Sequence, residues 1–555
     1  MTHSTLARPL QPRLLPARLQ GCRFSPTASS PHFLKEGLAR LFAGLGLLLM
    51  VACTETPSNG KPPAAASRST IIQNAMIVDG SGSTPYLGSM RIEGQRIKAV
   101  GALDALPGEL IIDASGLTLA PGFIDTHSHH DRGLKTAKDA VPLLTQGITT
   151  AVFGQDGDSH YPIKTFFDHY DAFPAAINVA SYVGHNTLRA HAMQARQKEV
   201  ADDKDIERMR ANLAEELAEG ALGLSTGLEY EPGLYSSKAE VLTLAEDTAA
   251  LGGRYISHIR SEDRFLWDAI DEVIDIGRQT GMPVQISHVK LAAKGLWGQS
   301  EKLLARLDEA RASGVQITAD VYPYEYWQST MWVLLPDRDP DNLAEIAFVL
   351  EELTPADGII FMAFEPNPDY VNRSVAEIAE LRGTTPVQTF SDLLKEAAAW
   401  SDAHEGRPAE TIVGRSMSEA DIRSLLTWPH SNVCSDGGYT GHPRGHGTFP
   451  LILARYVREE GLMTLAQAVQ AMTSRAAAHL GISNRGLLAP GYQADLVLFD
   501  AETVQDHATV RDGQKHSTGV SQVWVNGEIV LSDGRPTGVL SGDVIRRHQS
   551  FTAGL

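Results

Sequence analysis

Residues 121–131 read PGFIDTHSHHD, an apolar run that passes into three histidines and two carboxylates within seven residues. Burying such a cluster is costly unless something binds it. Imidazoles spaced H-x-H along a strand point to one face, as His127 and His129 would, and neutral imidazoles on one face can hold a metal ion. The stretch alone fits either a metal site or a polar turn at a strand end, and other stretches of the chain decide between them.

A unit of short apolar strand, polar strand end and helical segment recurs along the chain. The strand ends read GFIDTHSH, TTAVFGQDG, INVASYVGHN, ALGLSTGLE, RYISHIRSE, VQISHVK, ITADVYPY and SNVCSDGG. The segments between them, such as residues 202–220, carry apolar residues at the i, i+3 and i+4 spacing of helices. Eight such units, most of them about 30 residues apart, predict an α/β fold, a (β/α)8 TIM-like barrel whose strand C-termini build the active site.

Both chain ends and one internal segment fall outside this repeat. The ends alternate apolar and polar residues, with an Asn526–Gly527 hairpin signal, and predict one small β-sandwich built from both. The segment between the seventh and eighth strands is too long for a plain loop and has helical patterns, which predicts an inserted α/β, lid-like subdomain. The expected boundaries are 69–120 and 484–545 for the sandwich, 121–335 and 429–483 for the barrel, and 336–428 for the insertion.

The N-terminal region resembles an export signal. The apolar run LFAGLGLLLMVA is too short to span a bilayer, and with the following cysteine it ends in LMVAC, which resembles the lipobox of bacterial lipoproteins. We therefore expect a lipoprotein signal peptide over residues 1–52, lipidation at Cys53, and a flexible tether over 53–68. The expected location is the bacterial cell envelope, as a periplasmic or outer-membrane lipoprotein that meets the membrane only through its lipid anchor. A buried core helix is the alternative reading of the run.

The composition narrows the class of protein. A hydrophobic content of 43% and a charged content of 21% are ordinary for a soluble globular protein. The net charge of -19 argues against nucleic acid as a partner, since no basic stripe is present. Three cysteines cannot build a disulfide framework.

The candidate ligands lie at the same end of strand after strand. His258 and His288 follow the fifth and sixth strands, and either alone would more simply be a hydrogen-bonded core histidine. Together with the H-x-H pair and Asp436 after the eighth strand, they predict a divalent metal site, for which Zn²⁺ is the first candidate. A bound metal activates water and polarises a carbonyl. Asp436 is then the expected general base, with a purely ligating or turn-capping role as the alternative.

Several motifs, taken in order, resemble one enzyme family. PGFIDTHSHHD, GALGLSTGLEYEPG, YISHIRSE, ISHVK, SDGG with HPRGHGTFP, and RGLLAPGYQADLVLFD resemble the N-acyl-D-amino-acid deacylases (D-aminoacylases) of the amidohydrolase superfamily. The resemblance covers nearly the whole chain after Ser69. It implies hydrolysis of an N-acyl-D-amino acid to a carboxylate and a free D-amino acid. It also implies metal binding by His258 and His288, a second and often weaker metal position at His127 and His129, and Asp436 as the catalytic carboxylate.

One position departs from the family pattern. Members of the family usually place a cysteine ligand in a Gly-Asn-Cys-Gly turn after strand two, where this chain has Gly154-Gln155-Asp156-Gly157. Asp156 is expected to ligate in place of the thiolate, and as a harder ligand it shifts preference toward oxygen-liking metals. One or two ions, with Mn²⁺ or Co²⁺ as alternatives to Zn²⁺, remain open, and so does a role for Asp156 as a turn cap.

An N-acyl amino acid also presents an α-carboxylate, for which a cation is the natural partner. Arg444 and Lys290 follow predicted ligands closely, Tyr230 can donate a hydrogen bond, and the resemblance implies that these positions bind the carboxylate. Arg444 pairing with a carboxylate of the insertion and Lys290 as a solvated rim residue are the alternatives. His185 is expected either in the core or near the metal.

Other activities of the superfamily require different sequence features. Dihydroorotases and hydantoinases use a carboxylated lysine at the end of strand four, and ALGLSTGLEYEPG contains no lysine. A D-amino-acid or isoaspartyl-type dipeptidase needs the same water and carboxylate clamp, together with recognition of an amine. A non-catalytic cell-envelope binding lipoprotein is the non-enzymatic alternative.

Overall fold

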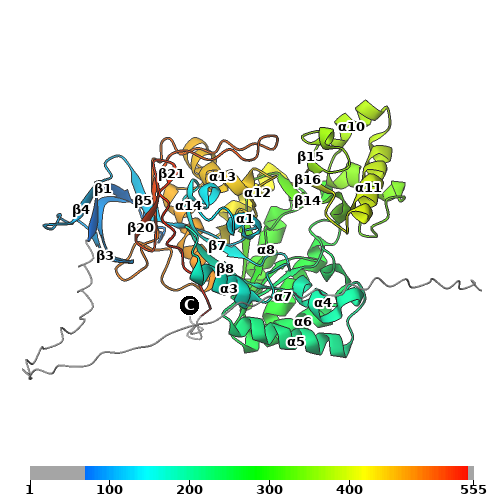
Figure 1. The fold of residues 1–555 in the computed structure, drawn as a ribbon, viewed down its shortest axis with the longest axis horizontal. Coiled ribbons are helices and arrows are strands. Elements are labelled where there is room, and N and C mark those ends of the chain that lie inside the picture. The colour runs from blue at the N-terminus through cyan, green and yellow to red at the C-terminus, as the bar shows by residue number, and fades with distance from the viewer. Residues whose placement is uncertain (1–68, 548–555) are drawn as a thin grey trace, which may run out of the picture. The chain divides into compact units, whose positions relative to one another are not determined.

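The computed structural model describes residues 69–547 (Figure 1). The predicted signal peptide, tether and Cys53 lie outside the described residues and stay predictions. Within the described part, no helix is long and apolar enough to cross a membrane.

The two chain ends form one sheet, seen as blue and red strands in Figure 1. The antiparallel pairing of Leu496–Phe499 with Thr118–Pro121 joins the C-terminal strands to the N-terminal ones. The hairpin predicted at Asn526–Gly527 is confirmed, since Val525 pairs with Glu528 and both turn residues have the positive φ of a type I′ turn. The sheet order is β21-β20-β19-β18-β5-β1-β2-β3, with β4 beside β1, and the strands are β1 (Thr70–Ile77), β2 (Tyr86–Glu93), β3 (Arg96–Gly101), β4 (Leu110–Asp113), β5 (Thr118–Pro121), β18 (Leu496–Phe499), β19 (Val520–Val525), β20 (Glu528–Ser532) and β21 (Arg535–Pro536).

Every predicted strand end belongs to a parallel strand. Neighbours pair in the orders β6-β7-β8 and β9-β10-β11-β12-β13-β17, and only Tyr182 separates β8 from β9. A parallel bridge joins Ser128 to Gly437, so the chain just after the first strand lies beside the chain just after the last. The strands are β6 (Phe123–Asp125), β7 (Ile148–Phe153), β8 (Asn178–Ser181), β9 (Val183–Gly184), β10 (Gly223–Gly227), β11 (Arg254–His258), β12 (Val284–Ile286), β13 (Ile317–Val321) and β17 (Ser431–Val433).

Helices connect these strands, as the periodicity predicts. α5 starts with a capping box in which the Asp202 side chain accepts from Asp205 N and the Asp205 side chain accepts from Asp202 N. α7 buries an apolar face and ends at Gly281, whose φ of 67° is the usual helix stop. The longer connecting helices are α3 (Ile163–Ala172), α4 (His185–Met193), α5 (Asp203–Ala218), α6 (Lys238–Ala250), α7 (Leu266–Thr280), α8 (Ser300–Ala312), α12 (Glu419–Thr427), α13 (Arg444–Leu451) and α14 (Leu465–Met472).

The insertion between β13 and β17 has a core of its own. Its antiparallel sheet has the order β14-β16-β15, and buried residues such as Phe361, Phe390 and Ile412 pack together beneath its helices. Its first strand precedes residue 336, while the predicted boundaries themselves stay predictions. The elements are β14 (Tyr326–Ser329), β15 (Ile359–Phe364), β16 (Glu410–Arg415), α9 (Leu343–Phe348), α10 (Val375–Arg382) and α11 (Pro386–Ala403).

Candidate metal centre and active site

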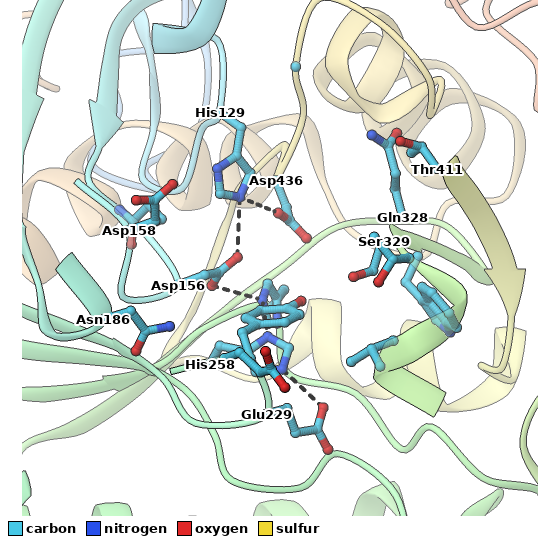
Figure 2. Close-up of a pocket in the computed structure, with 18 of the residues that line it drawn as sticks. His129, Asp156, Asp158, Asn186, Glu229, His258, Gln328, Ser329, Thr411 and Asp436 are labelled. Carbon is cyan, nitrogen blue, oxygen red and sulfur yellow. Dashed lines mark hydrogen bonds and ion pairs between the residues drawn. The ribbon is translucent and has the colours of Figure 1, made fainter. Parts of the chain in front are cut away.

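Four strand ends bring potential ligands together. Ligand atoms of His127, Asp156, His288 and Asp436 all lie within 4.8 Å of one another. His129 completes the group, because its Nε2 lies 3.2 Å from Asp156 Oδ2 and 3.2 Å from Asp436 Oδ1 (Figure 2). These residues follow β6, β7, β12 and β17, so ligands that are far apart in the sequence lie close together in space.

His258 extends the cluster on the side of β11. Its Nδ1 faces His288 Nε2 at 3.0 Å, and His288 Nε2 lies 3.2 Å from Asp156 Oδ1. Asp156 therefore turns one oxygen to His129 and the other to His288, so that its carboxylate lies between the two histidine pairs. All six residues predicted as ligands meet in one place.

The cluster fits a divalent cation. Both ring nitrogens of His127 are buried without a hydrogen-bond partner among the described residues, which is costly for an imidazole unless an ion or solvent occupies the site. Imidazole nitrogens and carboxylate oxygens are also the ligands that Zn²⁺ and similar ions take in catalytic sites. The residues present can therefore hold the metal that the sequence predicts.

Three of the predicted ligands have strained backbones. Asp156, His288 and Asp436 have φ values of 55°, 33° and 49°, in the left-handed region that favours glycine. Such conformations cost about 1–3 kcal/mol each and persist where the surrounding structure enforces them, often at functional sites. Three such conformations in one cluster indicate that the surrounding fold enforces the geometry of this site.

The charges of the cluster depend strongly on one another. Burial opposes a charge on His129, but its hydrogen bonds to Asp156 and Asp436 raise its pKa to about 9. Burial likewise opposes the Asp436 carboxylate, yet Arg444 and the nearby histidines hold its pKa well below its usual range. Protons on the imidazoles here balance the carboxylates, and a divalent cation would replace them, so metal binding should release protons.

Two carboxylates in the site were not assigned from the sequence. Glu229 Oε2 lies 3.1 Å from His258 Nε2, and Glu262 Oε1 lies 3.0 Å from His288 Nδ1. Each thus contacts the imidazole nitrogen that faces away from the cluster, as carboxylates that orient metal-bound histidines do. Both glutamates stand in strand-end motifs, but the sequence gives no sign that Glu262, four residues after His258, pairs with His288.

The three predicted substrate contacts, Tyr230, Lys290 and Arg444, line one cavity with a volume of about 1110 Å³. Arg444 Nη1 lies 2.6 Å from Asp436 Oδ2, and its guanidinium lies over the Tyr322 ring, so it pairs with the predicted base and not with the insertion. Lys290 is only 5% exposed and its Nζ lies 2.6 Å from Glu262, which excludes a solvated rim residue. The Tyr230 ring lies 4.4 Å from that of His258.

His185 belongs to the core. Its Nε2 lies 2.8 Å from Glu240 Oε1, and the Arg189 guanidinium donates to the same carboxylate. All three residues are buried, and none of them lines the cavity. Of the two positions expected for His185, the structure therefore shows the one in the core.

Known proteins show the same fold and sequence pattern. A model of the amidohydrolase family matches residues 110–352 and 367–531. N-acyl-D-glutamate deacylase of Alcaligenes xylosoxydans xylosoxydans is 34% identical over 508 residues, which are 87% of this chain and 97% of that protein. A crystal structure of D-aminoacylase superposes with a TM-score of 0.76 at 31% identity, over 86% of this chain and 99% of that one.

A further solved structure holds ligands. N-acyl-D-glutamate deacylase from Bordetella bronchiseptica, complexed with zinc and a phosphonate mimic of the tetrahedral intermediate, has a TM-score of 0.75 at 33% identity, over 86% of this chain and 99% of that one. The resemblance predicted from the motifs is confirmed. The chain belongs to the amidohydrolase family, in the group that includes the D-aminoacylases.

Proposed function

We propose that the protein is a metal-dependent deacylase that hydrolyses N-acyl-D-amino acids to a carboxylate and a free D-amino acid. The observation that carries the proposal is the meeting of six metal-ligand candidates beside one cavity, among them Asp436, which is paired to Arg444. The similarity to D-aminoacylase and N-acyl-D-glutamate deacylase supports the choice of substrate class.

The proposed architecture follows from the strand pairing. The parallel strands would close as a (β/α)8 barrel through the bridge between Ser128 and Gly437, supported by the bond from Asp436 N to His127 O of 2.8 Å. The sheet of the two chain ends would be the predicted β-sandwich, and residues 336–428 the lid-like insertion. The site would then lie at the C-terminal face of the barrel, where such folds build their active sites.

The proposed cofactor is one or two divalent ions, with Zn²⁺ first and Mn²⁺ or Co²⁺ as alternatives. His258 and His288 would hold one ion and His127 and His129 the other, with Asp156 between them. When bound, the metal polarises the amide carbonyl and lowers the pKa of a water molecule. The structural role of the chain is to hold these ligands at fixed positions on strand ends.

Asp436 is placed to move the proton. Its Oδ1 faces His127 and His129, which follow β6, and its Oδ2 is held by Arg444. Because these neighbours keep the pKa of Asp436 low, its carboxylate is charged at neutral pH and can accept a proton from the attacking water. It then passes that proton to the leaving amine, so that the amide and one water become an acid and an amine.

Arg444 is the best candidate for the α-carboxylate of the substrate. It is buried against Tyr322 and its guanidinium can pair with a carboxylate through two parallel hydrogen bonds. Lys290 is already bonded to Glu262, so we assign it a lesser share of substrate binding. Tyr230 would add a hydroxyl donor beside His258.

The other activities have less support. The end of β10 carries Leu228, Glu229 and Tyr230, so the lysine of cyclic-amide hydrolases is missing there. The dipeptidase and the binding lipoprotein lack a specific observation in their favour. Lipidation at Cys53 and a place in the cell envelope remain part of the proposal, and incorporation of labelled palmitate, lost in Cys53→Ala, would test them.

Metal exchange tests the proposed function. The purified protein would be stripped of metal, reloaded separately with Zn²⁺, Mn²⁺ and Co²⁺, and assayed for amine release from paired N-acetyl-D- and N-acetyl-L-amino acids. Activity on the D series that returns with metal supports the deacylase. Tight metal binding without turnover of either series would point to the dipeptidase, and failure to bind metal would leave only the binding protein.

A further inference from the structure

The cavity of the proposed active site extends to the inserted subdomain. On that side its lining includes the apolar residues Val333, Leu334, Leu353 and Pro408, and among them one carboxylate, that of Glu410. Glu410 is the first residue of β16 and pairs with Phe364 of β15. The same side also contributes the neutral polar residues Gln328, Ser329, Thr330, Thr411 and Ser416, so Glu410 is the one acidic group that the insertion adds to the described lining.

One side-chain oxygen of Glu410 has no hydrogen-bond partner among the described residues. The side chain is 4% exposed, its Oε1 accepts from Met331 N at 2.9 Å, and its Oε2 is buried with no hydrogen-bond partner among the described residues. Burial raises the pKa of Glu410 to about 8, and the bond from Met331 offsets this only in part. Without a ligand, Glu410 therefore holds its proton at neutral pH, because a buried carboxylate with no donor for one oxygen is costly. A cationic ligand that donates to Oε2 would remove that cost and favour the charged form.

The cations that line the cavity are already engaged. Arg132 lies 3.3 Å from Asp158, Lys290 lies 2.6 Å from Glu262, and Arg444 lies 2.6 Å from Asp436. If Arg444 receives the α-carboxylate, a second carboxylate on the substrate would have to compete with Asp158 for Arg132 or with Glu262 for Lys290. The cavity therefore disfavours an acidic side chain, although N-acyl-D-glutamate deacylases are among the similar proteins.

We propose that Glu410 and the apolar residues on this side of the cavity form a subsite for a cationic group of the substrate, an ammonium or guanidinium on an aliphatic stem. The proposal rests on the proposed function and names its substrate class. The stem would pack against Leu334 and Leu353, and the cation would donate to Oε2 as a charge-assisted hydrogen bond. The cation belongs to the side chain of the D-amino acid or to the acyl group, and the experiment separates these two sources.

The test compares substrates that differ by one charge. The first pair is N-acetyl-D-lysine and N-acetyl-D-norleucine, and the second is 6-aminohexanoyl-D-norleucine and hexanoyl-D-norleucine. Metal-loaded full-length protein is compared with Glu410→Gln, which keeps an acceptor for Met331 N, and with Glu365→Gln as the matched control. Glu365 follows β15 in the same sheet, is exposed and does not line the cavity. Unfolding curves confirm that both variants fold.

We expect kcat/KM for the cationic member of one pair to exceed that of its neutral partner at least tenfold. Glu410→Gln should abolish this preference, lowering kcat/KM for the cationic substrate about 30-fold while the neutral one changes less than threefold, and Glu365→Gln should change neither. The pair that shows the preference identifies the source of the cation.

Turnover of neutral substrates without a cationic preference in either pair overturns the subsite alone. An equal loss for charged and neutral substrates in Glu410→Gln also overturns it. Absence of hydrolysis with every substrate, the neutral ones included, instead overturns the proposed function.

Discussion

The guanidinium of Arg444 and the carboxylate of Asp436 form one buried ion pair, with Nη1 2.6 Å from Oδ2. The predicted base and the predicted binder of the substrate carboxylate are therefore a single unit. Arg444 holds one oxygen of Asp436, which leaves the other directed at His127 and His129. In the proposed mechanism, substrate binding and proton transfer are therefore coupled through this pair.

Replacing Asp436 should mainly lower kcat, whereas replacing Arg444 should mainly raise KM. Asp436→Asn removes the general base, so kcat should fall by about 100-fold or more while the protein still folds. Arg444→Lys keeps the charge but loses the two-pronged contact, so KM should rise about tenfold or more with a smaller change in kcat. Steady-state kinetics, with metal content measured on each variant, check both. A kcat for Asp436→Asn within tenfold of the wild type would contradict the assignment.

Replacing Asp156 should raise the stability of the metal-free protein and lower its affinity for metal. Asp156→Gly relieves the left-handed backbone and removes the carboxylate between the histidine pairs. The metal-free variant should therefore be more stable than the metal-free wild type by about 1 kcal/mol, while its metal affinity falls. Urea unfolding and chelator competition measure these two quantities. Asp156→Cys restores a softer ligand and should shift preference from Mn²⁺ toward Zn²⁺. Unchanged affinity in Asp156→Gly would leave Asp156 as a turn residue only.

Glu229 and Glu262 should act on the metal through the histidines. Glu229→Gln and Glu262→Gln weaken the contacts to His258 and His288, and loss of such a contact typically costs 10–100-fold in metal affinity or activity. Competition with a chromogenic chelator gives the affinity, and Glu207→Gln on the exposed face of α5 is the control. If both variants bind metal as tightly as the control, the two glutamates do not orient the ligands.

Glu410 should make stability depend on pH. Its pKa is raised from 4.5 to about 8, so the folded state holds this proton more tightly than the unfolded state. Its contribution is therefore present at acidic pH and is lost as the pH rises from about 4.5 to about 8. Between pH 5 and pH 8.5, the wild type should lose about 2–4 kcal/mol of stability relative to Glu410→Gln. Urea midpoints at both pH values measure this, and parallel curves for the two proteins would refute it.

The sequence predicted what depends on local pattern. Alternating apolar and polar residues and the Asn526–Gly527 signal located a hairpin, and polar residues after apolar runs located the strand ends. Parallel strands place their C-termini on one edge, so ligands as distant as His127 and Asp436 could be assigned to one site from their position after a strand. The grouping of these ligands could thus be predicted from the sequence alone.

Contacts between residues on different loops and elements could not be predicted from the sequence. Glu262 lies closer to His288, at 3.0 Å, than to His258, at 3.9 Å, and this depends on how the loops after neighbouring strands turn. The sequence assigned no role to Glu410, because its place in the lining of the cavity depends on how the insertion packs near the ends of the parallel strands. The motif of His185 left open a place in the core or near the metal, and its hydrogen bond to Glu240 on α6 shows that it belongs to the core.

The measurement that tests the account most directly is the stereochemistry of the amine released from a racemic N-acetyl amino acid. Racemic N-acetylnorleucine would be incubated with the metal-loaded protein, with the metal-stripped protein and with metal-loaded Asp436→Asn. The account predicts that the metal-loaded protein releases D-norleucine alone and stops at half conversion, and that the other two release at least 100-fold less. Release of the L enantiomer, or release by the stripped protein at the same rate, would contradict it.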